Sequence, residues 1–119
     1  MYIADGKTNG PAFSWPDGKR IAVMVTFDYD AEFLRISRAK SKGTTIGFTD
    51  FSRGQYGPHE GLARCLDMLD TMNIKSTFFV PGAVIETYRD TVEEIHRRGH
   101  ELACHGYRHE SDPELSRDE

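Results

Sequence analysis

Residues 21–30 read IAVMVTFDYD, an unbroken apolar run followed at once by two aspartates. Apolar and polar side chains do not alternate in this run, and β-branched residues are frequent in it. Such a pattern is typical of a strand that is buried on both faces of a parallel sheet. We therefore expect a first strand over Ile21–Phe27, with Asp28 and Asp30 at its carboxyl end.

Helical and strand patterns alternate in the second half of the chain. Apolar residues recur at helical spacing in two segments, and two short apolar runs are typical of strands. In chain order, the expected elements are a helix from about Pro58 to Met72 that stops at Asn73, a strand over Lys75–Val80, a helix from Val84 or Ile85 to Arg98 that is closed by Gly99, and a strand over Glu101–Cys104. This alternation predicts an α/β fold with parallel strands and right-handed helical crossovers.

Two stretches lack apolar periodicity. Residues 1–20 are rich in Gly, Pro, Asn and Lys, and we expect them to form an N-terminal arm that ends in a turn at Trp15–Gly18. Residues 35–57 contain four glycines and clusters of Ser and Thr, so we expect a long loop. The domain itself is then expected to occupy residues 21–119.

The composition narrows the class of protein. Of the 119 residues, 38% are hydrophobic and 29% are charged, which favours a single globular domain. The net charge of −4 argues against nucleic acid as a partner, and no apolar run approaches the ~18 residues of a membrane-spanning helix. Two cysteines make no disulfide framework, and the first residues do not resemble a secretory signal. We expect a cytoplasmic protein that binds neither nucleic acid nor membrane.

The residues that could carry chemistry follow the first and third expected strands. Ligands of parallel α/β proteins bind at the carboxyl ends of the strands, where Asp28, Asp30, His105 and His109 all fall. Two neutral imidazoles and one carboxylate can hold a divalent metal ion and leave positions open for water. The second aspartate could then take a proton from water.

A simpler interpretation exists for each pair. His-x-x-x-His pairs often arise by chance on surface helices, and an isolated Asp-x-Asp can consist of one helix-capping and one solvated carboxylate. The position of both pairs at strand ends of the same expected sheet favours the metal site.

Several motifs resemble the polysaccharide deacetylase family, also called the NodB-homology family. They are Ser76–Gly82, Gly99–Glu101 and His105–His109, and the resemblance covers roughly residues 14–119. The segment Phe27–Glu32 resembles a branch in which the usual adjacent Asp pair is spread by one residue. That branch includes cytosolic peptidoglycan deacetylase-like proteins, cyclic imide hydrolases and metal-independent allantoinase-like relatives.

The resemblance implies a metal-dependent hydrolase that acts on carbon–nitrogen bonds other than peptide bonds. An N-acetylated saccharide would be the substrate, with a cyclic imide or an allantoin-type amide as the alternative. Asp28 would be the catalytic base, and Asp30, His105 and His109 would hold Zn, with Co, Ni, Fe or Mn as other candidates. The implied fold is the N-terminal part of a distorted (β/α) barrel of about seven strands, whose second half, with its catalytic acid, is missing.

Three further residues have weaker claims to the site. The branch resemblance places Arg53 and Tyr56 near the substrate mouth, although a solvated loop explains them equally well. Glu32 could orient a metal ligand as a hydrogen-bond acceptor, or be a surface carboxylate. By contrast, we expect His100 to be a loop or packing residue rather than a ligand, and Cys104 to be a small buried hydrophobe.

Three strands cannot close a barrel, and they cannot cover the apolar faces of both expected helices. In addition, Ser116–Glu119 has the capping-box pattern that opens a helix. We therefore expect a second chain that completes the barrel, with a homo-oligomer as the alternative. A half-domain that is not catalytic without such a partner is a further possibility.

Overall fold

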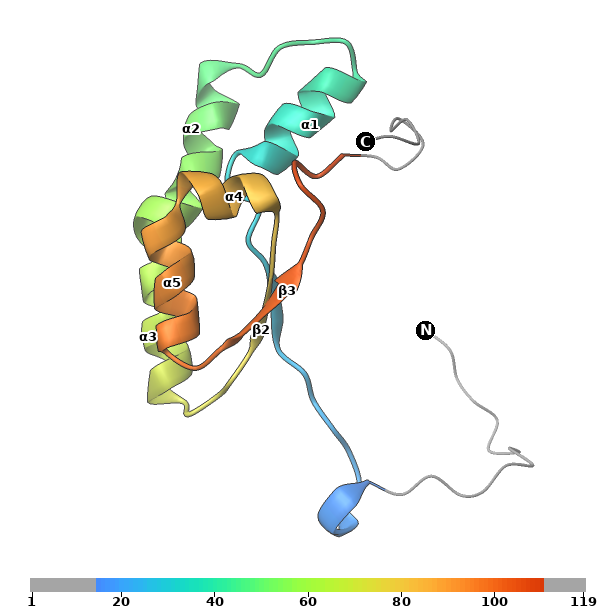
Figure 1. The fold of residues 1–119 in the computed structure, drawn as a ribbon, viewed down its shortest axis with the longest axis vertical. Helices are drawn as coiled ribbons and strands as arrows, with labels where there is room; N and C mark the ends of the chain where they lie inside the picture. The colour runs from blue at the N-terminus through green and yellow to red at the C-terminus, as the bar shows by residue number, and fades with distance from the viewer. Residues whose placement is uncertain (1–14, 111–119) are drawn as a thin grey trace, which may run out of the picture.

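The computed structural model describes residues 15–110, and these form a three-stranded parallel sheet with helical crossovers (Figure 1). The strand order is β1-β2-β3, with β1 at Thr26–Asp28, β2 at Thr77–Val80 and β3 at Glu101–Cys104. Phe78 of β2 is aligned with Phe27 on one side and with Leu102 on the other. The α/β class and the parallel strands therefore agree with the sequence prediction.

Helices fill both crossovers. Those between β1 and β2 are α1 (Phe33–Ser41), α2 (Phe48–Tyr56), the π-helical turn η2 (Gly57–Gly61) and α3 (Leu62–Thr71), and those between β2 and β3 are α4 (Gly82–Thr87) and α5 (Arg89–Arg97). In Figure 1, α3 and α5 run along one side of the sheet, while α1 and α4 lie beyond the carboxyl ends of the strands. No helix within residues 15–110 is long and apolar enough to cross a membrane.

The core lies between the sheet and the helices α3 and α5. Leu66 and Leu69 of α3 and Ile95 of α5 are almost completely buried, and so is Phe78 at the centre of β2. Phe27 stacks on Phe78 with ring centroids 4.9 Å apart. Of the apolar residues at helical spacing in the sequence, Leu62, Leu66 and Leu69 of α3 and Val92 and Ile95 of α5 are buried as predicted. Met72 and Ile85, which belong to the same predicted faces, are exposed.

The ends of both crossover helices also agree with their sequence signals. Asn73 has a φ of 52° and Gly99 a φ of 77°, so each occupies the left-handed conformation that terminates a helix. The Lys75 side chain lies within 4 Å of the place where a Cβ at Gly99 would stand, and its ammonium donates to the Arg98 carbonyl oxygen at 2.7 Å.

The first strand is much shorter than predicted. β1 begins at Thr26, and Ile21, Val23 and Met24 lie outside it with 75%, 79% and 86% of their surfaces exposed. In the described part of the chain, β1 pairs only with β2 and is an edge strand. An apolar run predicts that its side chains are buried. Residues 15–110 do not bury the side chains of Ile21, Val23 and Met24, and the run is therefore not paired as a strand over its full length.

The prediction of a long loop over residues 35–57 was wrong. Most of this segment is helical, in α1 and α2, and only the connection between these helices is irregular. Its glycines mark helix ends: Gly43 follows α1 with a φ of 66°, Gly47 precedes α2, and Gly57 follows α2. Gly54 lies inside α2 and Gly57 begins η2, which continues directly from α2, so the glycine count overstated the loop content.

Other boundaries also differ from expectation, and β2 begins at Thr77 rather than at Lys75. The helix predicted from Val84 or Ile85 to Arg98 is divided at Tyr88, whose φ of −124° and ψ of 44° are not helical. The predicted turn at Trp15–Gly18 is present as a single 3-10 turn over Pro16–Gly18. The rest of the N-terminal arm and the capping-box pattern at Ser116–Glu119 lie outside the described residues.

Candidate metal centre

The ends of β1 and β3 bring the predicted ligands together. The Tyr29 amide donates to the Phe79 carbonyl oxygen at 2.8 Å, which continues the β1–β2 pairing to the residue before Asp30. Ala31 then turns the chain with a φ of 50°, and α1 begins at Phe33. These contacts fix the backbone on both sides of Asp30.

The histidine segment is held from two directions. The carbonyl oxygens of Gly106 and Tyr107 accept hydrogen bonds from the Gly82 and Ala83 amides at 3.0 and 2.9 Å. The Ser37 hydroxyl of α1 donates to the His109 carbonyl oxygen at 2.7 Å. His109 itself has a φ of 60°, a left-handed conformation that is unfavourable for a non-glycine residue. The start of α4 and the middle of α1 therefore position both ends of this segment.

Three side chains converge at this point. Asp30 Oδ1 lies 3.4 Å from His105 Nε2, and Asp30 Oδ2 lies 3.9 Å from His109 Nε2. The two imidazole rings are nearly perpendicular, with centroids 4.8 Å apart. One ligand atom from each residue lies within 4.8 Å of the other two. The convergence expected of Asp30, His105 and His109 is therefore present.

The donor set fits a divalent cation. Asp30 Oδ1 and His105 Nε2 are buried and face each other, yet neither has a hydrogen-bond partner among the described residues. An unsatisfied buried polar group costs about 1–3 kcal/mol, which a cation between the two atoms would offset. Ligand atoms of a tetrahedral zinc site are about 3.3 Å apart, close to the shorter distance observed here. The three residues thus form a possible metal site.

The electrostatics of Asp30 support this assignment. Burial raises the pKa of its carboxyl group, His109 and His105 counteract the rise, and the neighbouring charge of Asp28 adds to it. The charges of the described residues therefore compensate the ionised Asp30 carboxylate only in part. A bound cation would supply the remaining positive charge.

Asp28 is adjacent to the cluster and does not belong to it. Both Asp28 and Asp30 line an open cavity of about 290 Å³ at the carboxyl end of β1. Arg53 lines the same cavity and lies 3.9 Å from Asp50. Tyr56 is half-exposed and packs against Gly61, and it is absent from the cavity wall. Of the two predicted substrate contacts, only Arg53 therefore lies beside the aspartates.

Glu32 is buried, with 5% of its surface exposed. Its carboxylate accepts a hydrogen bond from the Tyr88 hydroxyl, which lies 2.9 Å from both oxygens. Burial and this contact with Glu32 raise the pKa of Tyr88. Within residues 15–110, no hydrogen bond or ion pair joins Glu32 to His105 or His109, so Glu32 contacts Tyr88 rather than a metal ligand.

Sequence reasoning missed two residues that position this region. Tyr88 lies within the helix predicted from Val84 or Ile85 to Arg98, and nothing in that pattern indicated that its hydroxyl contacts Glu32. A Cβ on Gly54 would lie 2.5 Å from the Glu32 Cα, so α2 packs directly on the backbone of Glu32. Because the sequence analysis predicted a loop over residues 35–57, Gly54 gave no signal of this close approach.

The expectations for His100 and Cys104 had different outcomes. His100 is buried, packs edge-on against Phe78, and accepts the Ser76 amide at Nδ1 at 3.2 Å, which confirms a packing role. Cys104 was expected to be buried and is exposed. Its strand, β3, is the other edge of the described sheet, so no neighbouring strand covers it.

Comparisons with known proteins identify the family. The sequence pattern described as "Polysaccharide deacetylase" matches residues 16–119. The chain is 31% identical over 106 residues to the peptidoglycan deacetylase-like protein FGM2 of Gibberella zeae, covering 84% of the chain and 31% of that protein. It is 37% identical over 62 residues to the peptidoglycan deacetylase of Helicobacter pylori, covering 52% of the chain and 21% of that protein.

A solved structure agrees with these matches. The crystal structure of a "putative polysaccharide deacetylase" from Mycobacterium smegmatis superposes with a TM-score of 0.77 and 40% sequence identity, over 93% of this chain and 38% of that one. The chain thus spans between a fifth and two fifths of the length of these three proteins. On this evidence, the chain belongs to the polysaccharide deacetylase (NodB) family.

Proposed function

We propose that this chain provides the metal-binding part of a hydrolase that removes the acetyl group from an N-acetylated saccharide. The observation that carries the proposal is the convergence of Asp30, His105 and His109 beside Asp28 at one end of the sheet. The names of the relatives from Gibberella zeae and Helicobacter pylori support a saccharide substrate. The complete domain would be a distorted (β/α) barrel.

Zinc is the ion we propose for the site, because two imidazoles and one carboxylate suit it well. When bound, a divalent ion supplies Lewis acidity, which polarises a carbonyl group and makes water more acidic. Asp30, His105 and His109 would hold the ion, and the histidines must be neutral to do so. The contacts from Ser37 and from the start of α4 keep the His105–His109 segment in place.

Asp28 is the proposed general base. Asp28 lines the same cavity as Asp30 and is outside the set of three ligands. In the reaction, water adds to the acetyl carbon while an Asp28 oxygen takes the water proton. The carbon–nitrogen bond then breaks as the nitrogen takes up the proton that the water lost, so that an amine and acetate are the products. Arg53 is the proposed contact with the substrate at the cavity wall.

The experiment compares two substitutions in the protein purified in its native assembly, that is, together with any second chain or further copy that completes the barrel. Asp28→Asn should retain zinc and lower the release of acetate from chitooligosaccharides by ~10²-fold or more, because it removes the base only. Asp30→Ala should lose zinc, because it removes a ligand. Equal loss of zinc in both variants would contradict these roles.

The same assay separates the alternative functions. Ring opening of a cyclic imide without acetate release would assign the protein to the amide-hydrolysing branch. Bound zinc with neither activity would indicate a metal-binding half-domain that is not catalytic.

A further inference from the structure

Three arginines line the cavity that contains Asp28 and Asp30. Arg35 and Arg38 come from α1, and Arg53 comes from α2. The carboxylate of Asp50 lies 3.3 Å from Arg35 and 3.9 Å from Arg53, so one acidic residue serves both. In the part of the chain that the structure describes, Arg38 forms no ion pair within 4 Å. The three arginines are thus matched in number by the carboxylates of Asp28, Asp30 and Asp50, and a positive excess arises in this cavity when a divalent ion is bound.

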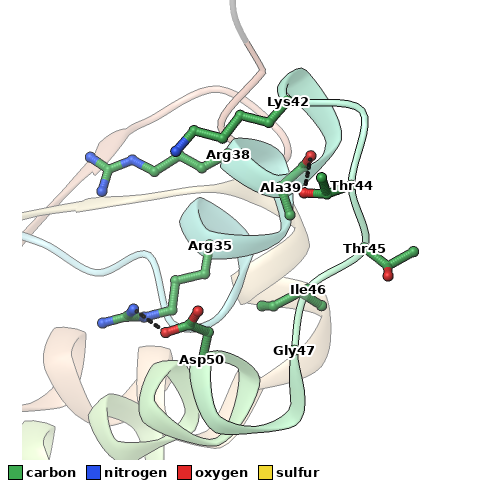
Figure 2. Close-up of a pocket in the computed structure, with 9 residues that line it drawn as sticks. All are labelled: Arg35, Arg38, Ala39, Lys42, Thr44, Thr45, Ile46, Gly47 and Asp50. Atoms are coloured by element: carbon green, nitrogen blue, oxygen red, sulfur yellow. Dashed lines mark hydrogen bonds and ion pairs between the residues drawn. The ribbon is translucent and has the colours of Figure 1, made fainter.

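The basic surface continues beyond this cavity. A second cavity of about 270 Å³ between α1 and α2 is lined by Arg35, Arg38, Lys42 and Asp50, among others (Figure 2). Figure 2 shows the Arg35, Arg38 and Lys42 side chains extending to the same side of α1. Their spacing of three and four residues places them on one helix face. Because Arg35 and Arg38 line both cavities, one basic strip leads from Lys42 to Asp30.

The charge of this strip exceeds what the metal site needs. A divalent ion would offset Asp28 and Asp30, and Asp50 would offset one of the four cationic side chains. An uncharged saccharide offers nothing to balance the rest. Guanidinium groups bind carboxylate and phosphate oxygens well, through paired and charge-assisted hydrogen bonds.

We propose that Arg38, with Arg35 and Lys42 beside it, binds an oxyanion on the substrate. The preferred substrate would then be an acidic N-acetylated saccharide, which carries a carboxylate or a phosphate near its acetamido group. This inference rests on the proposed function, because it assigns the chemical class of the substrate of the same site.

The test uses three probes that share an N-acetylglucosamine unit. N-acetylglucosamine is neutral, N-acetylmuramic acid adds a carboxylate, and N-acetylglucosamine 6-phosphate adds a phosphate. Binding to the zinc-loaded protein, in its native assembly, is measured by isothermal titration calorimetry. The protein in every titration carries Asp28→Asn, so that it does not hydrolyse the bound probe. The two anionic arms distinguish a carboxylate from a phosphate.

We expect at least one anionic probe to bind about tenfold more tightly than the neutral one at low salt. Arg38→Gln should remove most of this preference, and high salt should weaken it. The control is Arg64→Gln, since Arg64 is an exposed arginine of α3 that pairs with Glu60 and lines neither cavity. This control should retain the preference in full.

Equal binding of the neutral and anionic probes would overturn the inference, as would a preference that survives Arg38→Gln. Failure of all three probes to bind at millimolar concentration would overturn it too. Failure of the proposed function has a different signature: the protein without Asp28→Asn would retain zinc and release no acetate from any probe.

Discussion

The Tyr88 hydroxyl lies 2.9 Å from both carboxylate oxygens of Glu32 and donates its hydrogen bond to them. Tyr88 is the residue at which α4 ends and α5 begins, and Glu32 is two residues after Asp30. The contact therefore joins the crossover between β2 and β3 to the segment that contains the proposed metal ligand Asp30. Gly54 packs against the backbone of the same Glu32, so α2 is tied to this segment as well.

Replacement of Tyr88 by Phe should destabilise the protein and weaken zinc binding. The buried Glu32 carboxylate would lose its donor, and an unsatisfied buried group of this kind costs about 1–3 kcal/mol. Chemical denaturation and zinc calorimetry measure the two effects. Tyr107→Phe is the matched control for stability, because its hydroxyl bonds to Glu86 on the surface, where the loss should be smaller. Equal losses in the two variants would show that the Glu32 contact has no special role.

Gly54→Ala should also be destabilising, because its Cβ would lie 2.5 Å from the Glu32 Cα and backbone would have to move. Overpacking of this kind typically costs about 1–3 kcal/mol. Gly47→Ala is the control: Gly47 has a φ of −77° and no atom within 4 Å of the place where its Cβ would stand, so its effect should stay within about 0.5 kcal/mol. The comparison uses urea midpoints. A neutral Gly54→Ala would mean that α2 does not pack closely on Glu32.

Stability should fall as the pH drops below 6.5, in part because of His100. Burial and the charge of Lys75 lower the pKa of His100 below its usual value of 6.5. The neutral ring accepts the Ser76 amide at Nδ1, and protonation removes that acceptor. A lowered pKa in the folded state gives stability that is present above pH 6.5 and is lost as the pH falls through the folded value.

Thermal unfolding between pH 7 and pH 5 measures this dependence. His100→Asn should flatten it, whereas His96→Asn should not, because His96 is exposed at the end of α5. Parallel curves for the His100 variant and the unmodified protein would contradict the assignment.

We propose that the exposed apolar residues before β1 mark a surface that another polypeptide segment covers. Ile21, Val23 and Met24 are each at least three-quarters exposed, and burying such side chains gains about 25 cal/mol per Å². The 119-residue chain alone should therefore self-associate at micromolar concentration. Sedimentation velocity tests this, and Val23→Asp should reduce the association. A monodisperse monomer with a sharp thermal transition would contradict the proposal.

Local patterns in the sequence were sufficient to predict much of this fold. The spacing of Leu62, Leu66 and Leu69 identified the buried face of α3, and the strand ends located Asp30 and His105. The helices α1 and α2 were missed because glycines at their ends resembled loop composition. The contacts of Glu32 with Tyr88 and Gly54 could not be predicted, because they join residues more than 20 positions apart through packing that no local pattern encodes.

Zinc binding is the most direct test of the central claim, that Asp30, His105 and His109 form one metal site. Calorimetric titration of the native assembly should give one zinc ion per chain. His105→Ala and His109→Ala should each weaken binding at least ~10-fold, because each removes a ligand. His96→Ala, an exposed histidine outside the cluster, should bind as the unmodified protein does. Unchanged affinity in both ligand variants, or no zinc binding by the unmodified protein, would contradict the claim.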